Sequence, residues 1–216
     1  MFDGIINTAA QVEAPDEERI YGMVVAQVIS NIDLTNQGRV QLHLPWLNSI
    51  DPWARVAVLM AGPDSGTYFI PQQGDEVLVA FNHGDVSDPF VVGSLWNGQD
   101  KPPAQESLDP VNKRMIRTPK GHTLVFDDLE QSITIKHATG GQVELTSDKI
   151  ELSIGPASIL LEQNGSITIK TEGTLNLDAT TINISADAKL GLSGKTSASM
   201  DGGASCSINA ASISIG

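Results

Sequence analysis

The side chains of this 216-residue chain that could do chemistry are four histidines, one cysteine and a scatter of carboxylates. The histidines are His43, His83, His122 and His137, and none lies within four residues of another. The sequence contains no Gly-x-Ser-x-Gly elbow, no Gly-x4-Gly-Lys-Ser/Thr phosphate loop and no His-Glu-x-x-His zinc motif. We therefore predict that the chain is not an enzyme and has no catalytic residue, no cofactor and no metal site.

The carboxylates of the C-terminal half are dispersed along the chain, from Glu144 to Asp201. A glycoside hydrolase needs two carboxyl groups about 5–10 Å apart in a groove, and no such pair is evident in the sequence. The single cysteine, Cys206, is in register with Ile208, which favours a small packed side chain over a nucleophile. A β-helical, tailspike-like enzyme that degrades polysaccharide stays open as the alternative function.

A short repeat accounts for most of the C-terminal half. Two apolar residues flanking a polar one recur from Ile133 to Ile215, with a mean period of about eight residues, and Ser-Ile-Thr-Ile-Lys occurs twice. A fixed short period is typical of stacked β architectures, and each apolar pair lies on one face of a short strand. The predicted core consists of these pairs: Ile133 and Ile135, Val143 and Leu145, Ile150 and Leu152, Ile167 and Ile169, Leu175 and Leu177, Ile182 and Ile184, Leu190 and Leu192. Ile159 and Leu161 follow the same pattern.

Eight residues are too few to close one turn of a single-chain solenoid, which commonly needs on the order of 18. Closure by three chains, each contributing one side of every turn, is the interpretation that we favour, and it predicts an intertwined trimeric β-helix, or β-prism. In this arrangement each strand edge would be hydrogen-bonded to another chain. A single-chain solenoid with two or three octads per turn remains the alternative.

Charge is distributed unevenly along the chain. Residues 1–100 contain 13 acidic and 3 basic residues, whereas residues 101–216 contain 13 acidic and 10 basic ones. Binding of nucleic acid requires a basic surface, so we predict no nucleic-acid partner. The single cysteine rules out an intrachain disulfide, and the N-terminus does not resemble a signal peptide. We therefore expect assembly in the cytoplasm.

The N-terminal half has a different pattern. Alternating runs over 20–30, 39–47, 53–59, 76–82 and 90–96 predict five strands, separated by turn-forming stretches such as Asn82–Pro89. Five strands without an amphipathic helix indicate a small barrel of the OB type. The predicted fold is therefore all-β. Its parts are an N-terminal arm (1–18), an OB-fold domain (19–97), a linker and needle base (98–132) and a needle (133–216).

An ordered series of short motifs resembles the OB domain of contractile-injection spikes, namely the VgrG-type spikes and the phage baseplate spikes. The motifs are Gly38-Arg39-Val40-Gln41-Leu42, Trp53-Ala54-Arg55-Val56-Ala57, Gly74-Asp75-Glu76-Val77, Pro89-Phe90-Val91-Val92-Gly93 and Gly121-His122-Thr123-Leu124. The resemblance covers roughly residues 20–216. We expect neither a VgrG-type hub domain before the barrel nor an inserted lysozyme module, so the resemblance implies a short spike whose hub is a separate chain.

This resemblance implies a homotrimeric, cell-puncturing spike. Its barrel would dock on a baseplate hub protein and its needle would make transient contact with the target-cell membrane. The particle would be assembled in the cytoplasm and would act at the target-cell envelope. We expect the needle to end with an apolar layer and unpaired strand edges, which a PAAR-type tip protein would cover. The expected tip site is Ser212, Ile213, Ser214, Ile215 and Gly216.

Overall fold

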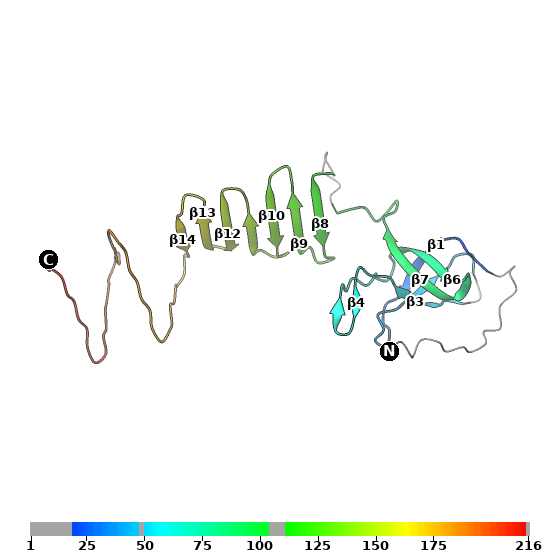
Figure 1. Cartoon of the computed structure of the whole chain (residues 1–216), viewed down its shortest axis with the longest axis horizontal. Coiled ribbons are helices and arrows are strands. Elements are labelled where there is room, and N and C mark those ends of the chain that lie inside the picture. Colours follow the sequence, from blue (N-terminus) through cyan, green and yellow to red (C-terminus); the bar gives the residue numbers. More distant parts are fainter. Residues whose placement is uncertain (1–18, 48–49, 104–110, 215–216) are drawn as a thin grey trace, which may run out of the picture.

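The computed structural model describes residues 19–47, 50–103 and 111–214. It is elongated, with a small barrel near one end, a flat sheet in the middle and an extended segment at the C-terminal end (Figure 1). Every regular element in these residues is a β-strand. The predicted all-β fold is therefore confirmed.

Five strands close the barrel in the order β1-β2-β3-β7-β6. The strands are β1 (Val24–Ser30), β2 (Val40–His43), β3 (Trp53–Val56), β6 (Glu76–Asn82) and β7 (Asp85–Leu95). Neighbouring strands are antiparallel except β3 and β7, which pair in parallel. Alternating side chains from all five strands fill the interior, which confirms the five-stranded barrel that the sequence pattern predicts.

The barrel contains the hydrophobic core of the described residues, ten apolar side chains that are at most 9% exposed. They are Ala26, Val28, Val40, Leu42, Leu44, Ala54, Val77, Val79, Phe81 and Val91. No residue between 111 and 214 reaches this degree of burial. The barrel is thus the one part of the described chain that has a closed core of its own.

The turn between β6 and β7 is tighter than the sequence suggests. We expected a loop over Asn82–Pro89, but β7 already begins at Asp85 and Pro89 is buried within it. His83 and Gly84 reverse the chain with φ of 48° and 82°, the left-handed conformation that two-residue hairpin turns require. The register shifts between Phe81 and Asn82, and such irregularities are where a strand accommodates proline.

A small hairpin between β3 and β6 was not predicted. It consists of β4 (Ala61–Gly62) and β5 (Ser65–Gly66), and it projects from the barrel on the side of the flat sheet (Figure 1). We call residues 57–70 the arm; it is distinct from the N-terminal arm that the sequence predicts over residues 1–18.

Seven further strands form one antiparallel sheet in sequential order, which we call the shaft sheet. They are β8 (Lys113–Arg117), β9 (Thr123–Asp127), β10 (Ser132–Lys136), β11 (Gln142–Leu145), β12 (Lys149–Ile154), β13 (Ala157–Glu162) and β14 (Ile167–Lys170). The sheet begins at Lys113, inside the segment that we interpreted as linker and needle base. The division at residue 133 stays a prediction.

Strand pairing in the shaft sheet differs from our expectation that every strand edge is bonded to another chain. From β8 to β14 each strand pairs with its sequence neighbour in the same chain. The connecting turns are short, and glycines such as Gly155 and Gly165 occupy left-handed conformations in two of them. Tight turns bring consecutive strands together as antiparallel neighbours. One strand and one turn thus account for the eight-residue period.

Residues 171–214, which we call the distal segment, contain no strand, although the eight-residue repeat continues through them. The chain runs there in long extended legs (Figure 1). All of its residues after Thr171 are exposed. Pairing within the chain therefore stops at Lys170.

Candidate self-association surface

The register of the shaft sheet aligns its apolar side chains in two continuous rows across all seven strands. The first row is Ile116, Leu124, Ile135, Val143, Leu152, Ile159 and Ile169. The second row is Arg114, Phe126, Ile133, Leu145, Ile150, Leu161 and Ile167. Residues paired across strands lie on the same face. The rows therefore make one face of the sheet almost entirely apolar.

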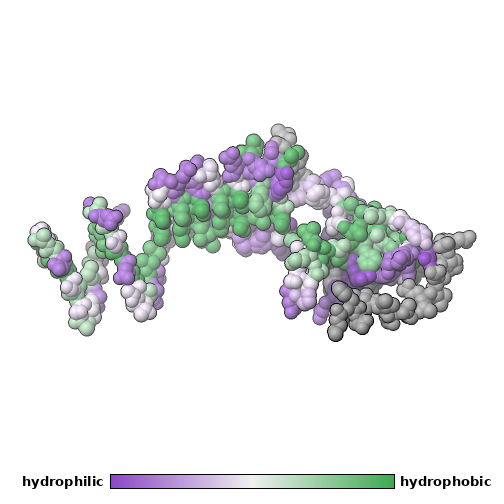
Figure 2. Space-filling view, viewed as in Figure 1, coloured by the Kyte–Doolittle hydropathy of each residue, from purple (hydrophilic) through white to green (hydrophobic). Residues whose placement is uncertain are grey.

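This apolar face has no cover in the described chain. Ten of its thirteen apolar side chains are more than a third exposed, from Ile133 at 37% to Ile167 at 69%. Figure 2 shows the face as a continuous hydrophobic band with polar surface along its margins. An apolar surface of this extent on a soluble protein marks a contact with another molecule.

The opposite face of the sheet is mostly polar, and some of its charges form ion pairs. Glu144 and Glu151 lie directly opposite each other in register, and Lys149 Nζ lies 2.9 Å from Glu144 and 2.8 Å from Glu151. The hydrogen bond to Glu151 is the main reason why the pKa of Lys149 lies above its ordinary value, and the hydrogen bond to Glu144 is the second. The lysine thus offsets a repulsion between two carboxylates that would otherwise oppose this pairing.

A second charged pair lies nearer the barrel on this polar face. Lys113 Nζ is 3.0 Å from the Asp127 carboxylate, which also accepts a hydrogen bond from the Glu130 backbone N–H at 3.1 Å. These contacts, the Glu130 bond foremost, lower the pKa of Asp127. The polar face is therefore suited to water and the apolar face to burial.

The structure divides the predicted core residues into two groups. Those from Ile133 to Ile169 lie together on the apolar face. The other six, Leu175, Leu177, Ile182, Ile184, Leu190 and Leu192, lie in the distal segment and are each about half exposed or more. Their role as a core stays a prediction. Of the expected tip site, Ser212, Ile213 and Ser214 are extended and exposed, whereas Ile215 and Gly216 lie outside the described residues.

Two histidines that are distant in sequence meet where the interior strands β9 and β10 begin and end. The rings of His122 and His137 have centroids 4.3 Å apart. The N–H groups of Ala138 and Thr139 donate to Nδ1 of His122 and of His137, at 3.4 and 3.3 Å. Both Nδ1 atoms therefore act as acceptors of backbone hydrogen bonds from the turn at residues 138–139. Among the described residues no three His, Cys, Asp or Glu side chains are grouped to hold a metal.

Sequence reasoning missed this histidine pair, because fifteen residues separate its members. The signal that could have found it is the antiparallel register of β9 and β10, which pairs Thr123 with Lys136 and so brings the flanking histidines together.

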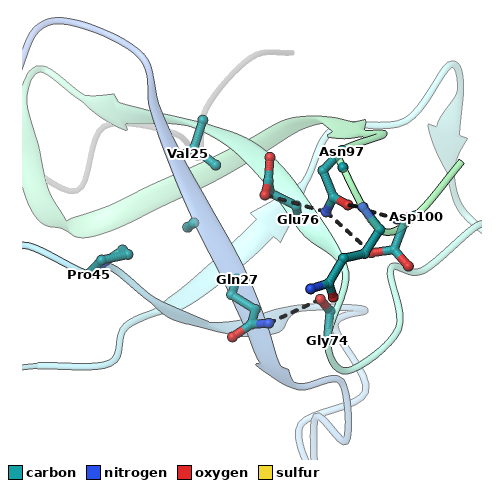
Figure 3. Close-up of a pocket in the computed structure, with 10 residues that line it drawn as sticks. Val25, Gln27, Pro45, Gly74, Glu76, Asn97 and Asp100 are labelled. Carbon is teal, nitrogen blue, oxygen red and sulfur yellow. Dashed lines mark hydrogen bonds between the residues drawn. The ribbon is translucent and has the colours of Figure 1, made fainter.

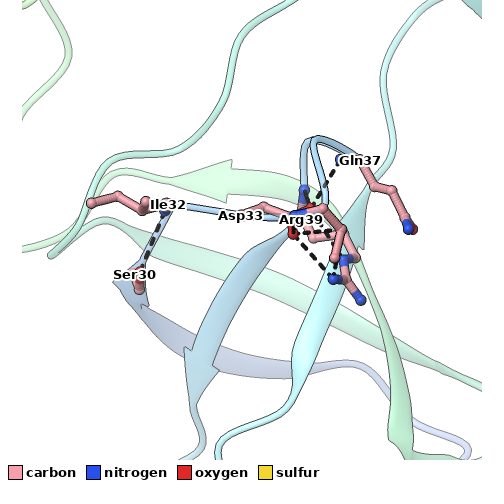
Figure 4. A network of polar contacts seen from close by, with 6 residues as sticks. Ser30, Ile32, Asp33, Gln37 and Arg39 are labelled. Atoms are coloured by element: carbon pink, nitrogen blue, oxygen red, sulfur yellow. Dashed lines mark hydrogen bonds and ion pairs between the residues drawn. The ribbon is translucent and has the colours of Figure 1, made fainter.

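The barrel carries one polar network that fixes a turn near the arm (Figure 4). The Asp33 carboxylate accepts hydrogen bonds from the backbone N–H groups of Thr35, Gln37 and Arg39, at 3.0, 3.1 and 3.2 Å. The Arg39 guanidinium donates to both of its oxygens at 3.1 Å. The bond with Arg39 is the main reason why the pKa of Asp33 lies well below its usual range. These contacts hold the turn between residues 33 and 39, so the role of this carboxylate is structural.

The groove between β1, β6 and the Asn97–Asp100 turn has a volume of about 500 Å³ (Figure 3). The Asn97 side chain binds that turn: its Oδ1 accepts hydrogen bonds from the Gln99 and Asp100 N–H groups at 2.8 and 2.7 Å. Its Nδ2 donates to the Asp100 carboxylate at 3.2 Å. These hydrogen bonds fix the turn at the point where the chain leaves the barrel.

The chain is thus an all-β protein in which a closed OB-type barrel is joined to a sheet whose apolar face is uncovered in the described residues. Comparison with known families places the chain more closely. Residues 24–96 match the type VI secretion system/phage-baseplate injector OB domain. Residues 113–175 match the phage baseplate V C-terminal trimerisation domain. Together the two matches cover well over half of the chain, which belongs to this family of injection-apparatus spike proteins.

Several curated relatives are spike proteins by name. The chain is 32% identical over 110 residues to the type VI secretion system spike protein VgrG3 of Vibrio cholerae, covering 46% of this chain and 11% of that protein. It is 28% identical over 130 residues to the spike protein VgrG2a of Pseudomonas aeruginosa, covering 54% and 15%. A further relative, 30% identical over 101 residues, is the actin cross-linking toxin VgrG1 of Vibrio cholerae, of which the chain covers 9%. The chain thus spans about a seventh or less of these relatives.

Among the described residues, no helix is long and apolar enough to cross a membrane.

Proposed function

We propose that this chain is the central spike of a contractile injection apparatus and that it works mechanically, as a homotrimer. The observation that carries the proposal is the pair of apolar rows, which run the length of the shaft sheet and which no part of the described chain covers. Three such faces turned towards one axis would bury all three sets of rows. The match to a trimerisation domain over residues 113–175 supports this arrangement.

The distal segment supports the same assembly in a different way. Its described residues form no strand in the chain, yet they continue the repeat with paired apolar residues such as Leu175 and Leu177. Backbone N–H and C=O groups in a packed structure need partners. In the trimer, neighbouring chains would supply them, and this part of the shaft would be intertwined. The shaft would thus begin as a prism with one sheet per chain and continue as a three-chain β-helix.

Stiffness follows from this arrangement. Strand edges along the shaft would be bonded either within a chain or between chains, which leaves no free edge along its length. Apolar burial would stabilise the axis by about 25 cal/mol per Å² of surface removed from water. The force for puncture would come from a contracting apparatus rather than from this chain.

The barrel would dock on a baseplate hub protein. Its end opposite the shaft carries the β6–β7 turn at His83 and Gly84 and the exposed Trp46, and the strongly acidic first 100 residues suit a cationic or hydrogen-bonding protein partner. Co-purification with the hub should survive deletion of residues 133–216, with circular dichroism to verify that the barrel remains folded. Loss of the hub from a variant with a folded barrel would contradict this part of the proposal.

At the far end, residues 212–216 would receive a PAAR-type tip protein and then meet the target-cell membrane. The described part of this site is extended and exposed, with Ile213 between two serines, as in a strand to which another strand can be added. Removing residues 213–216 should leave the trimer intact and abolish capture of the tip protein. Unchanged capture would exclude this site.

A polysaccharide-degrading enzyme is the less favoured function. Two of the repeat's carboxylates, Glu144 and Glu151, are paired with Lys149 on the polar face rather than gathered in a groove. Release of reducing sugar from bacterial polysaccharide by the purified trimer would favour the enzyme.

A further inference from the structure

The barrel holds the arm at its two ends, where the Ala57 N–H donates to the Val91 carbonyl at 2.8 Å and Ile70 packs against the core. Between these ends the hairpin has little support from the described chain. Each of its strands has two residues, joined by the pairs Ala61–Gly66 and Gly62–Ser65. One further bond, from the Thr67 N–H to the Met60 carbonyl at 3.0 Å, closes its base. A two-stranded hairpin is marginally stable in water unless it packs against something. The arm therefore needs a surface to hold its conformation.

Four large apolar side chains lie exposed at the base of the arm, two on each leg. Leu59 is 95% exposed and Tyr68 is 81% exposed, and Met60 and Phe69 are each more than half exposed. Asp64, at the tip, is the only charged residue between 57 and 70. Such a concentration of exposed apolar surface with almost no charge is typical of a protein contact.

The arm lies at the end of the barrel from which the chain leaves for the shaft. β3 ends at Val56, where the arm begins, and β7 ends at Leu95, at the same end of the barrel. Figure 1 shows the arm on the shaft side of the barrel. In Figure 2 hydrophobic surface at its base is visible from the same side as the apolar face of the shaft sheet. Both apolar surfaces are thus exposed on the side of the molecule that this view shows.

We infer that the arm is a clasp between protomers: Leu59, Met60, Tyr68 and Phe69 pack against a neighbouring copy of this chain where the barrels meet the shaft. The inference rests on the proposed function, because it requires the homotrimer. We propose a second copy of this chain as the partner, because burial of the apolar rows would bring neighbouring chains close to the end of the barrel that carries the arm. The cores of permanent homo-oligomer interfaces are also apolar and poor in charge, as the arm is. A hub protein attracted by the acidic barrel would find almost no charge here.

Photo-crosslinking in the full-length trimer tests the clasp. A benzoylphenylalanine at Tyr68 is the probe, and the matched control is the same probe at Tyr21, which is 71% exposed near the β6–β7 turn at the opposite end of the barrel. We expect irradiation to link Tyr68 to a second copy of the chain at several times the yield from Tyr21. Mass spectrometry would identify the peptide of the neighbouring copy.

The possible outcomes test the contact made by the arm separately from the formation of the trimer. A chain of trimeric mass whose Tyr68 probe gives no product between copies, or no more than Tyr21, would overturn the clasp and leave the proposed function intact. Crosslinks from Tyr68 to an added hub protein, with none between copies, would overturn it as well. A chain that is monomeric before irradiation would contradict the proposed function itself. As a second variant, Leu59→Asp should leave the circular dichroism spectrum unchanged and reduce the Tyr68 crosslink several-fold.

Discussion

Leu152 and Leu160 lie on neighbouring strands, β12 and β13, but on opposite faces of the shaft sheet. Leu152 pairs with Ile159 in an apolar row, whereas Leu160 pairs with Glu151 on the polar face. The proposed trimer buries the first leucine and leaves the second in contact with water. Replacing each leucine by alanine removes the same atoms, so the comparison isolates the face.

The expected magnitude follows from the exposure of Leu152, which is 49% in the single chain. Full burial of a leucine side chain is worth about 1.5–3 kcal/mol, so the half that remains for neighbours contributes about 1 kcal/mol per chain. Three chains lose about 3 kcal/mol in Leu152→Ala, with a cavity cost in addition. A loss of 3 kcal/mol weakens the trimer dissociation constant about 150-fold. The midpoint concentration varies as the square root of that constant, so it should rise about twelve-fold.

Sedimentation over a dilution series, at a fixed urea concentration that partly dissociates the native trimer, measures this shift. Leu160 is partly buried within its own chain, and Leu160→Ala loses that burial equally in the dissociated chain and in the trimer. We therefore expect it to change trimer stability by at most about 0.5 kcal/mol per chain, a shift of no more than about 3.5-fold. Equal shifts for the two variants, or no shift for Leu152→Ala, would refute the assignment of the apolar rows to the trimer interface.

Three further predictions concern charge and assembly. Because the pKa of Asp33 is lowered in the folded state, its stabilising contribution is present above about pH 4 and is lost as the pH falls through the folded value. Asp33→Asn should therefore lower the unfolding temperature at pH 6 and narrow the difference between pH 6 and pH 3. Lys149→Met leaves Glu144 facing Glu151 and should lower the unfolding temperature by a few degrees, an effect that 1 M salt should reduce; an unchanged temperature at low salt would contradict the pairing. Ile167→Asp would place three carboxylates near one axis and should prevent assembly of the trimer. The backbone amides of residues 171–214 should then exchange rapidly with deuterium. Slow exchange of these amides in the variant would count against an intertwined distal segment.

The sequence was sufficient to predict the five strands of the barrel and, up to Lys170, the strands and faces of the repeat, because these depend on local alternation. Apolar residues at every second position of β6 and β12 indicate a strand with one buried side whatever its partners are. The predicted barrel and the predicted repeat depend on this rule alone, and motifs such as Gly74-Asp75-Glu76-Val77 supplied the family.

Pairing partners were harder to predict, because they depend on turn geometry. The period of eight residues is the same whether a strand pairs with its own neighbour or with another chain. The left-handed turns at Gly155 and Gly165 make each strand up to Lys170 pair with its neighbour in the same chain. The meeting of His122 with His137 follows from that pairing and was missed for the same reason. The arm was missed because strands of two residues have no periodicity to detect.

The mass of the full-length chain in solution tests the central claim most directly. Light scattering coupled to size-exclusion chromatography should give three times the chain mass of 22.9 kDa, in a single peak, because the apolar rows and the distal segment find their partners only in other copies. A folded, monodisperse species of 22.9 kDa would contradict the account.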